Sequence, residues 1–344
     1  MSSEKKIRFA VVGQGHIGKR HAEMILRNPQ AELAAVCDVL SPETCKVPHV
    51  EVPFYRSYDE MLEKTPGLDV VNVCTPNGLH AGMALKALEK GLHVVIEKPV
   101  ALTKSDAEKI VFKSLERRKN VFCVMQNRYS PPSVWLKSVI DQKLLGKLFH
   151  VQINCYWNRD GRYYTRKNWH GDAQLDGGTL FTQFSHFIDI MYWLFGDIQN
   201  ISGRFQDFNH QALTDFEDTG IVNFEFLNEG IGTLNYSTAV YNENLESSLT
   251  VIGEKGTIKV AGQYMNEVVY CNIQDYQMPE LEASAPPNDY GLYKGSAQNH
   301  HLVIQNVVDT LNGNVPISTN ALEGLKVVDI IERIYLERDR VWKK

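Results

Sequence analysis

Residues 7–18 read Ile-Arg-Phe-Ala-Val-Val-Gly-Gln-Gly-His-Ile-Gly, an apolar run that ends in a glycine-rich turn. The run 7–12 is typical of a buried strand, and the pattern over 16–28 predicts a helix directly behind the turn. Glycines in the order G-x-G-x-x-G permit a tight turn and let a pyrophosphate approach the helix N-terminus. An acidic residue about 20 positions later, at the end of the next strand, accepts hydrogen bonds from an adenosine ribose. The sequence therefore predicts a dinucleotide site at Gly13, Gln14, Gly15, His16, Ile17, Gly18 and Asp38.

The residues after Asp38 indicate which dinucleotide is bound. Val39 and Leu40 follow it, where an enzyme that uses NADP would place an arginine for the 2′-phosphate. NAD is therefore favoured over NADP as the cofactor. Arg56 or Lys46 could reverse this preference, and a purely structural glycine turn is the remaining alternative for the whole motif.

Short runs rich in Val, Ile and Ala alternate with helical patterns through the first part of the chain. Such alternation indicates strand-helix-strand units around a parallel sheet. We expect strands at 7–12, 32–37, 69–74, 92–97 and 121–125, and helices at 16–28, 58–64, 78–90 and 104–118. The fold class is α/β, with an N-terminal Rossmann domain over residues 1–125.

Beyond Pro131 and Pro132 the pattern changes to alternating polar and apolar residues, which is typical of a sheet with one solvated face. We expect strands at 149–156, 198–206, 219–227, 230–238, 247–252, 256–261 and 267–273, and helices at 133–142, 177–195, 299–312 and 320–338. This predicts a second α/β domain over 126–344, with a large, mostly antiparallel open sheet. The last helices could pack back on the first domain.

Composition limits the classes of protein. The chain has 344 residues, 43% hydrophobic and 22% charged, with 36 Lys and Arg against 41 Asp and Glu for a net charge of −5. This balance argues against a nucleic-acid partner, and the apolar runs are too short to cross a membrane. Residues 1–6 lack the pattern of a secretory signal, so a cytoplasmic location is expected. The six scattered cysteines contain no C-x-x-C pair, so we expect free thiols and no metal site.

Two further strand ends carry polar residues. The run 69–74 leads into Thr75-Pro76-Asn77 and His80, and the run 92–97 ends in Glu97-Lys98-Pro99. Because open parallel sheets bind ligands at their carboxyl ends, the cofactor crevice is expected to be lined by Thr75, Pro76, Asn77, His80, Glu97 and Lys98. Asn77 could instead be a simple helix cap and His80 a satisfied buried histidine. Lys98 is poorly placed for a solvated surface charge, which favours a functional role. Gln126, after the run 121–125, is included among the cofactor-binding residues.

The helix expected at 177–195 is apolar on almost every side, so it should be buried. Its polar residues include Thr182, Gln183, His186 and Asp189, which spacings of three and four place on one face. A buried polar face needs partners, so this one should meet a site or a polar network. His186 is the candidate proton acceptor because imidazole titrates near neutrality, and Asp189 could orient it. A histidine that merely packs in the core is the alternative.

The segment 157–172 is dense in Arg, Lys and aromatic residues. Arginine forks bind carboxylate or phosphate, and aromatic faces stack on sugars and bases, so this loop could hold an anionic ring-shaped ligand. It could instead pack on a neighbouring subunit. The candidate substrate residues are Arg128, Tyr129, Arg159, Tyr163, Arg166, Trp169, Asp172, Thr182 and Gln183.

Together these motifs resemble the glucose-fructose oxidoreductase, inositol dehydrogenase and MocA (Gfo/Idh/MocA) family. The shared marks are the glycine turn with Asp38, Cys74-Thr-Pro-Asn-x-x-His80, Glu97-Lys-Pro99, and Gly177-Gly followed by His186-x-x-Asp189. The resemblance implies an NAD(P)-dependent dehydrogenase acting on CH–OH groups, with Lys98 and His186 as the catalytic pair. It also implies dimer or tetramer contacts through the C-terminal sheet, and a cis Lys98–Pro99 bond.

Three stretches are most similar to nucleotide-sugar 3-dehydrogenases of the WlbA/WbpB type, which act on UDP-N-acetylglucuronic acid in surface-polysaccharide (lipopolysaccharide) synthesis. They are Gln126-Asn-Arg-Tyr129, the run Trp169-His-Gly-Asp172 into Asp176-Gly-Gly178, and Asn299-His300. Thr182 stands where inositol-type members have Asp and the nucleotide-sugar branch usually has Asn, which argues against an Asp–His pair of the polyol type. The alternatives are a polyol or inositol dehydrogenase or keto-sugar reductase of the same family, and a non-catalytic dinucleotide sensor.

Overall fold

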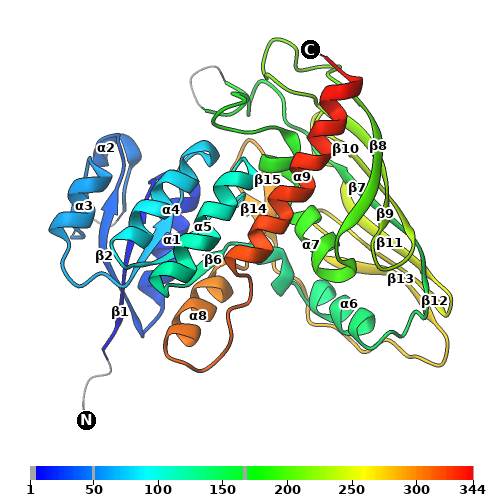
Figure 1. Ribbon diagram of the computed structural model, residues 1–344, viewed down its shortest axis with the longest axis horizontal. Coiled ribbons are helices and arrows are strands. Elements are labelled where there is room, and N and C mark those ends of the chain that lie inside the picture. The colour runs from blue at the N-terminus through cyan, green and yellow to red at the C-terminus, as the bar shows by residue number, and fades with distance from the viewer. Residues whose placement is uncertain (1–4, 49–50, 166–168, 344) are drawn as a thin grey trace. The chain divides into compact units, whose positions relative to one another are not determined.

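A computed structural model describes residues 5–48, 51–165 and 169–343. Its internal contacts divide the chain into two compact units, and each is described by itself (Figure 1). Unit 1 consists of Met1–Met125 and His300–Val328, and unit 2 of Gln126–Asn299 and Asp329–Lys344.

Unit 1 is built on a six-stranded parallel sheet in the order β3-β2-β1-β4-β5-β6. Its strands are β1 (Ile7–Val12), β2 (Ala31–Cys37), β3 (Phe54–Tyr55), β4 (Val70–Val73), β5 (His93–Ile96) and β6 (Val121–Cys123). Strands β2 and β3 lie on one side of β1, and β4, β5 and β6 lie on its other side. The direction in which the chain adds strands therefore reverses between β1 and β4. Open α/β sheets bind ligands at such a point.

The first helices of unit 1 are α1 (His16–Arg27), α2 (Pro42–Cys45), α3 (Tyr58–Lys64), α4 (His80–Glu89) and α5 (Lys104–Arg117). Side chains cap three of them. The Ser41 hydroxyl caps α2, the Ser57 hydroxyl accepts the backbone N–H of Glu60 in α3, and the Thr103 hydroxyl that of Asp106 in α5. The sequence did not predict α2 or β3, which are too short to produce a periodic pattern.

The chain returns to unit 1 near its C-terminal end. Helix α8 (His300–Leu311) packs against α1 (Figure 1), and the Asn28 side-chain amide donates to Gln305 across that contact. Further along, the backbone N–H of Cys123 in β6 donates to the Thr319 carbonyl, which covers the edge of the sheet. Helix α9 (Ala321–Val341) follows.

Unit 2 contains a seven-stranded sheet in the order β13-β12-β11-β7-β10-β9-β8. Its strands are β7 (Leu148–Tyr156), β8 (Ile198–Gln206), β9 (Thr219–Phe226), β10 (Ile231–Ser237), β11 (Glu246–Gly253), β12 (Gly256–Ala261) and β13 (Glu267–Ile273). Strands β7 and β10 are parallel and the other neighbours are antiparallel, so the sheet is mixed and mostly antiparallel as expected. A separate pair, β14 (Pro287–Asp289) and β15 (Lys294–Ala297), was not predicted, since its strands are short and polar.

One face of this sheet carries the core of unit 2, which α6 (Pro131–Asp141) and α7 (Ser185–Phe195) help to form. Strand β9 shows the alternation: Val222, Phe224 and Phe226 are buried, while Ile221 just before them is half exposed. The other face also exposes apolar side chains, among them Ile231 and Ile252, which both pair with His150.

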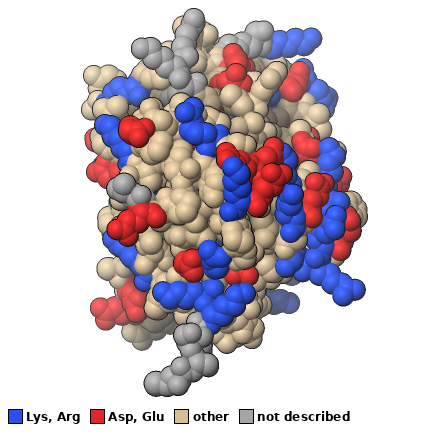
Figure 2. Space-filling view, turned by 90° about the vertical axis from the view of Figure 1, so that its left-hand side faces the viewer, with Lys and Arg blue, Asp and Glu red and all other residues tan. Residues whose placement is uncertain are grey.

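The remaining surface and thiol features are simple. Within the ranges described above, no helix has the combination of length and apolar sequence that a bilayer crossing requires. On the face drawn in Figure 2, acidic and basic side chains are interspersed. All six cysteines lie in the described part of the chain and are free thiols.

Candidate functional site

The glycine turn lies between β1 and α1 at the reversal of strand order. Gly13 has a φ of 88°, and a Cβ there would lie 2.4 Å from the Cys74 carbonyl oxygen. A Cβ on Gly18 would lie 1.7 Å from the Gly13 carbonyl oxygen. The chain's own packing therefore requires both glycines.

Gly15 differs, because a Cβ there would meet nothing within 4 Å. It is the N-cap of α1, and no side chain caps the helix. The space beside Gly15 at the start of the helix is thus open, and a helix N-terminus is where a pyrophosphate binds. His16 is exposed and Ile17 half-buried beside it, so residues 13–18 fit the dinucleotide that the sequence predicts.

Asp38 stands at the end of β2 next to this turn. Its Oδ2 accepts the backbone N–H of Gln14 at 2.7 Å, and its Oδ1 accepts that of Leu40 at 2.9 Å. The carboxylate is thus fixed beside the turn, as ribose recognition requires. The exposed Arg56 donates to the Val39 carbonyl oxygen from Nε at 2.9 Å, so its guanidinium lies close to this strand end.

The ends of β4 and β5 carry the second part of the predicted crevice. Thr75, Pro76 and Asn77 follow β4, and Asn77 begins a short 3-10 turn, Asn77–Leu79, ahead of α4. His80 is buried, with Nδ1 2.7 Å from the Pro99 carbonyl oxygen and Nε2 2.8 Å from the Thr75 carbonyl oxygen. Burial lowers the pKa of His80, which these two hydrogen bonds oppose. His80 therefore ties the end of β4 to the segment after Lys98, in line with the buried-histidine alternative.

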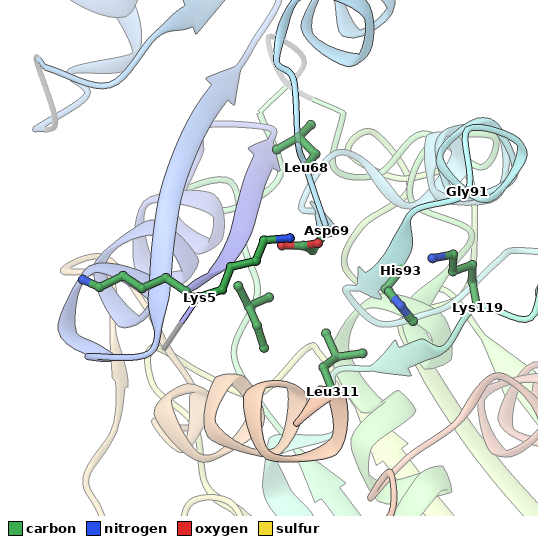
Figure 3. Close-up of a pocket in the computed structure, with 9 residues that line it drawn as sticks. Lys5, Leu68, Asp69, Gly91, His93, Lys119 and Leu311 are labelled. Atoms are coloured by element: carbon green, nitrogen blue, oxygen red, sulfur yellow. The ribbon is translucent and has the colours of Figure 1, made fainter. Parts of the chain in front are cut away.

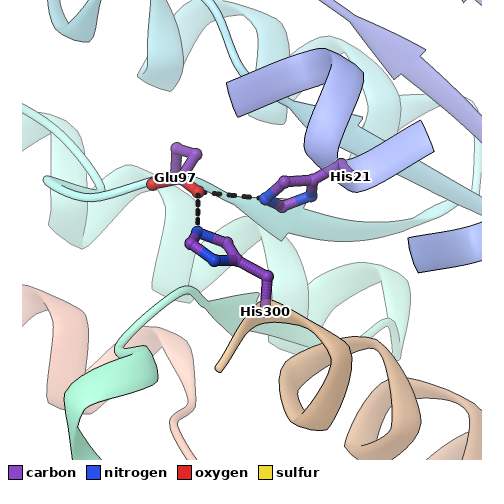
Figure 4. A group of neighbouring side chains, drawn as sticks. All are labelled: His21, Glu97 and His300. Carbon is purple, nitrogen blue, oxygen red and sulfur yellow. Dashed lines mark hydrogen bonds and ion pairs between the residues drawn. The ribbon is translucent and has the colours of Figure 1, made fainter. Parts of the chain in front are cut away.

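Glu97 lies at the end of β5 and points into the interior of unit 1 (Figure 4). Its Oε1 lies 3.0 Å from His21 Nε2 and 3.7 Å from His300 Nε2. Its Oε2 accepts the backbone N–H of Lys98 at 3.2 Å. Burial alone would raise the pKa of Glu97, but the bonds and charges of the two histidines outweigh it and hold the pKa well below its usual range. The Lys98–Pro99 peptide bond is cis, as the resemblance implied.

The Glu97 cluster is also one of two groups in the described residues with the donor set of a metal site. In the other, the ligand atoms belong to Asp207, His210 and Asp218. The ligand atoms within each group lie within 4.8 Å of one another. Asp218 is already used by the chain, since its Oδ2 accepts the backbone N–H groups of Phe208 and Asn209.

His186 lies on α7 in unit 2 and is 3% exposed. The sequence predicted one continuous helix over 177–195, but residues Leu180–Phe184 form a π-helical turn before α7 begins. The Tyr335 hydroxyl accepts the backbone N–H of Leu180 at 2.8 Å, which satisfies a donor that has no partner inside the helix because Leu180 is its first residue. Because a π turn has more residues per turn, the four-residue spacing from Thr182 to His186 does not by itself place them on one face.

The polar residues of this segment have partners in unit 2. The Thr182 hydroxyl donates to the buried Asp176, through both its carbonyl and a carboxylate oxygen. That Asp189 could orient His186 stays a prediction; in the structure both Asp189 oxygens accept from Arg128, Oδ2 from Nε at 2.8 Å and Oδ1 from Nη2 at 2.6 Å. Arg128, a candidate for substrate binding, thus forms a buried bidentate ion pair.

Arg159 is the most enclosed of the predicted substrate residues, at 2% exposure. Its Nε donates to Gln183 Oε1 at 2.7 Å, its Nη2 donates to the Lys294 carbonyl oxygen, and the guanidinium stacks on the rings of Trp157, Tyr163 and Tyr293. The Gln183 amide in turn donates to the Tyr163 hydroxyl at 2.9 Å. The contacts of Arg159 thus use most of its hydrogen-bond donors inside unit 2.

The other candidates in this region lie nearer the surface. Asp172 is exposed and accepts the backbone N–H groups of Gln174 and Leu175, as a turn residue does. Trp169 is half-buried against His170, which stacks on Tyr163. Arg166 lies outside the described residues. In unit 2 Tyr129 is half-buried, and the Gln126 carbonyl oxygen accepts from the Asn299 amide at 3.1 Å.

A surface pocket of unit 1 lies at the opposite edge of the parallel sheet (Figure 3). It is lined by residues at the amino ends of β1, β4 and β5, among them Lys5, Asp69 and His93, and by Lys119. Asn120 donates its backbone N–H to His93 Nδ1 at 3.0 Å, and burial lowers the pKa of His93 to about 4. This pocket is remote from the carboxyl ends where the glycine turn lies, so it is not the predicted crevice.

Comparison with known protein families agrees with this geometry. Residues 7–126 match the oxidoreductase family model with an NAD-binding Rossmann fold, and residues 134–259 match the GFO/IDH/MocA C-terminal domain. The chain belongs to the Gfo/Idh/MocA oxidoreductase family. It is therefore an oxidoreductase whose Rossmann domain binds NAD.

Members of this family with solved structures resemble the chain along nearly its full length. The WlbA dehydrogenase from Bordetella pertussis, crystallised with NADH and UDP-GlcNAcA, is 30% identical, and the match covers 98% of each chain with a TM-score of 0.85. That from Chromobacterium violaceum, with the same two ligands, is 29% identical, covering 99% of this chain and 95% of the other with a TM-score of 0.87. The scyllo-inositol 2-dehydrogenase (NAD(+)) of Bacillus subtilis is 27% identical over 271 residues, 74% of each chain.

Sequence reasoning missed His21, which contacts Glu97 in the interior of unit 1. His21 lies on the buried face of α1 with Gly18, Ala22 and Ile25, a spacing of three, four and seven residues that marks the inner side of the helix. A histidine on that side requires a buried partner, which was a usable signal. The partner, Glu97, was instead expected to line the crevice.

Proposed function

We propose that this protein oxidises a UDP-N-acetylhexosaminuronic acid at C3 with NAD, as a step in surface-polysaccharide synthesis. The observation that carries the proposal is the 30% identity, over 98% of both chains, to a WlbA dehydrogenase that holds NADH and UDP-GlcNAcA. The open N-terminus of α1 and the fixed Asp38 support the cofactor half of the reaction.

In this proposal residues 13–18 hold the pyrophosphate and Asp38 the adenosine ribose, while Thr75, Asn77, Lys98 and Gln126 contribute to the rest of the cofactor site. The cofactor supplies one piece of chemistry when bound, the acceptance of a hydride at C4 of its nicotinamide ring. His186 takes the proton of the substrate hydroxyl, and Lys98 stabilises negative charge on the oxygen as the ketone forms. One C–H bond and one O–H bond break, and a C=O double bond forms.

The fixed position of the Lys98 backbone supports its role. Glu97 Oε2 holds the Lys98 N–H and His80 holds the Pro99 carbonyl, at the edge of the sheet where ligands bind. Thr182 stands where an Asp–His pair would need a carboxylate, and its hydroxyl donates to Asp176. Position 182 therefore offers no carboxylate to accept the proton from His186.

A second candidate function is oxidation of a neutral polyol. The 27% identity to a scyllo-inositol 2-dehydrogenase favours it, and the enclosed contacts of Arg128 and Arg159 leave fewer cations for an acidic substrate. We further propose a cytoplasmic location and a homodimer or homotetramer built on the open face of the unit 2 sheet, where Ile231 and Ile252 expose apolar surface.

The test incubates the purified protein and NAD with UDP-N-acetylglucuronic acid, with 2-oxoglutarate present to reoxidise retained NADH. UDP-N-acetylglucosamine, which lacks the carboxylate, and scyllo-inositol are the matched comparisons. We expect a product two hydrogens lighter from the acidic sugar alone, detected by mass spectrometry. Oxidation of scyllo-inositol alone would support the second candidate, and oxidation of none, with NAD bound, would contradict both.

A further inference from the structure

Three buried histidines surround the segment Glu97–Pro99 in unit 1. His21 comes from α1, His80 is the first residue of α4, and His300 is the first residue of α8, so the three lie far apart in the sequence. Their exposed fractions are 0%, 1% and 1%. Such groups are costly to bury, and buried charge adds little to stability by itself, so their convergence on one short segment requires a reason.

The Glu97 carboxylate connects two of these histidines to Lys98. One oxygen, Oε1, faces His21 Nε2 at 3.0 Å and His300 Nε2 at 3.7 Å, and the other, Oε2, accepts the Lys98 N–H at 3.2 Å (Figure 4). The position of the Glu97 side chain is therefore coupled to that of the peptide that carries Lys98.

Asn72 sets the direction of these bonds. Its amide nitrogen lies 2.8 Å from His21 Nδ1, so Nδ1 accepts, and the ring proton lies on Nε2, where it donates to Glu97. His300 lies edge-on to the His21 ring, with centroids 5.7 Å apart, and completes the enclosure of the carboxylate.

We propose that His21 and His300 are positioning residues for Lys98, acting through Glu97. They hold the carboxylate so that its second oxygen fixes the backbone from which the Lys98 side chain extends to the carboxyl edge of the sheet. This inference rests on the proposed function only in giving Lys98 a role in the reaction. Placing it there matters because an error of about 1 Å in a reacting group costs on the order of 100-fold in rate.

The same three side chains could instead hold a metal ion. Two ligands on a tetrahedral zinc ion, with bonds of about 2.0–2.1 Å, lie roughly 3.3 Å apart, which falls between the two distances to Glu97 Oε1. The Asn72 contact favours the hydrogen-bonded interpretation, because it places a proton between His21 and Glu97 where an ion would have to be. Metal content is therefore one outcome of the test.

The test uses three variants of the full chain: His300→Ala, His300→Gln and, as a matched control, His301→Ala. His301 is the exposed neighbour of His300 on the same helix turn. Glutamine can return an N–H donor to the position of the imidazole Nε2, so it should rescue what alanine loses. Thermal unfolding and NAD affinity report whether each variant folds.

The first readout requires no substrate. Reductive methylation with ¹³C-formaldehyde labels lysine amines, and the signal of Lys98 is assigned from its absence in Lys98→Arg. We expect His300→Ala to shift and broaden this signal, His300→Gln to restore it largely, and His301→Ala to leave it unchanged. A folded His300→Ala variant with an unchanged Lys98 signal would overturn the proposal, because a merely structural histidine would not affect that lysine.

The second readout is turnover of the substrate identified above. His300→Ala should lower kcat by about 10- to 100-fold while changing the Kd for NAD less than about twofold. If the wild type turns over no substrate, the proposed function fails while the lysine signal still decides the positioning role. Stoichiometric metal in the purified wild type, lost in His300→Ala, would overturn the proposal in favour of a metal site.

Discussion

Lys98 is the residue on which the proposed chemistry depends most. It follows β5 directly, and hydrogen bonds from buried side chains fix the backbone on both sides of it. Lys98→Met keeps the length of the side chain and removes its charge. We expect NAD to bind as before and kcat to fall about 10²- to 10⁴-fold, the range for loss of a group that assists proton transfer.

Lys90→Met is the control for that substitution, since Lys90 is an exposed lysine at the end of α4. His186→Asn should show the same pattern as Lys98→Met, because we propose that both act on one hydroxyl. Turnover near the wild-type rate in both variants, measured by NADH absorbance, would contradict the assignment of the pair.

His93 gives unit 1 a dependence on pH that can be measured. Burial lowers its pKa to about 4, whereas a histidine in the unfolded chain titrates near 6.5. Between these values the unfolded chain binds a proton that the folded chain excludes, so the free energy of unfolding decreases as the pH falls from 6.5 towards 4. His93→Asn retains an acceptor for the Asn120 N–H and removes the titration.

Between pH 7 and pH 4.5 the melting temperature of His93→Asn should therefore fall less than that of the wild type. The exposed His301→Asn should follow the wild type throughout. Parallel curves for wild type and His93→Asn would mean that the folded chain protonates His93 as readily as the unfolded chain does.

At the scale of elements, the glycines of the turn at 13–18 have different roles. Packing of the chain requires Gly18, whereas we propose that cofactor binding requires Gly15. Gly15→Ala adds a Cβ into open space, and Gly18→Ala adds one at 1.7 Å from the Gly13 carbonyl oxygen. We expect Gly15→Ala to fold with little change in melting temperature but to weaken NAD binding at least about tenfold, because the methyl group enters the space that the pyrophosphate would occupy. Gly18→Ala should fail to fold stably.

Gly82→Ala in α4 is the matched control, since a Cβ there also meets nothing within 4 Å. It should raise stability by up to about 1 kcal/mol, as alanine does in a helix interior, without affecting NAD. Isothermal titration with NAD measures Gly15→Ala and Gly82→Ala, and thermal unfolding measures Gly18→Ala. Unchanged affinity in Gly15→Ala would place the pyrophosphate elsewhere.

The ion pair between Arg128 and Asp189 links the turn Gln126–Tyr129 to α7 inside unit 2. Removing one partner leaves an uncompensated buried charge, so Arg128→Met should cost about 3–5 kcal/mol in the free energy of unfolding. Adding Asp189→Leu to that variant should recover part of the loss. If Arg128→Met instead raised KM at unchanged stability, the arginine would be a substrate residue.

The elements of the parallel sheet could be predicted because periodicity and capping are local. β1, β2 and α1 begin or end within a residue or so of their predicted positions, and Ser57 and Thr103 cap the helices expected of them. The π turn at 180–184 could not be predicted, because the segment is apolar on almost every side and its pattern does not distinguish a π turn from an α-helical one.

The same difference between local and distant causes applies to the candidate site. The turn at 13–18 with Asp38 carries its function in its spacing, and the structure places it as expected. Glu97 was expected only to line the crevice, and the structure adds its contact with His21; the ion pair between Asp189 and Arg128 was likewise not predicted. Tertiary packing decides which charged groups form ion pairs.

At the scale of the whole molecule, we propose that the chain moves a hydride from C3 of an acidic nucleotide sugar to NAD. Its two units carry different parts of that claim, with the cofactor turn and Lys98 in unit 1 and His186 in unit 2. Family models match residues 7–126 as an NAD-binding Rossmann fold and residues 134–259 as a GFO/IDH/MocA C-terminal domain.

The most direct measurement is a single turnover with UDP-N-acetylglucuronic acid that carries deuterium at C3, followed by mass spectrometry of the cofactor. The account predicts that the wild type yields NADH one mass unit heavier than normal and that Lys98→Met does not. NADH without the label would place the oxidation at another carbon. No reduced cofactor, with NAD shown to bind, would contradict the claim.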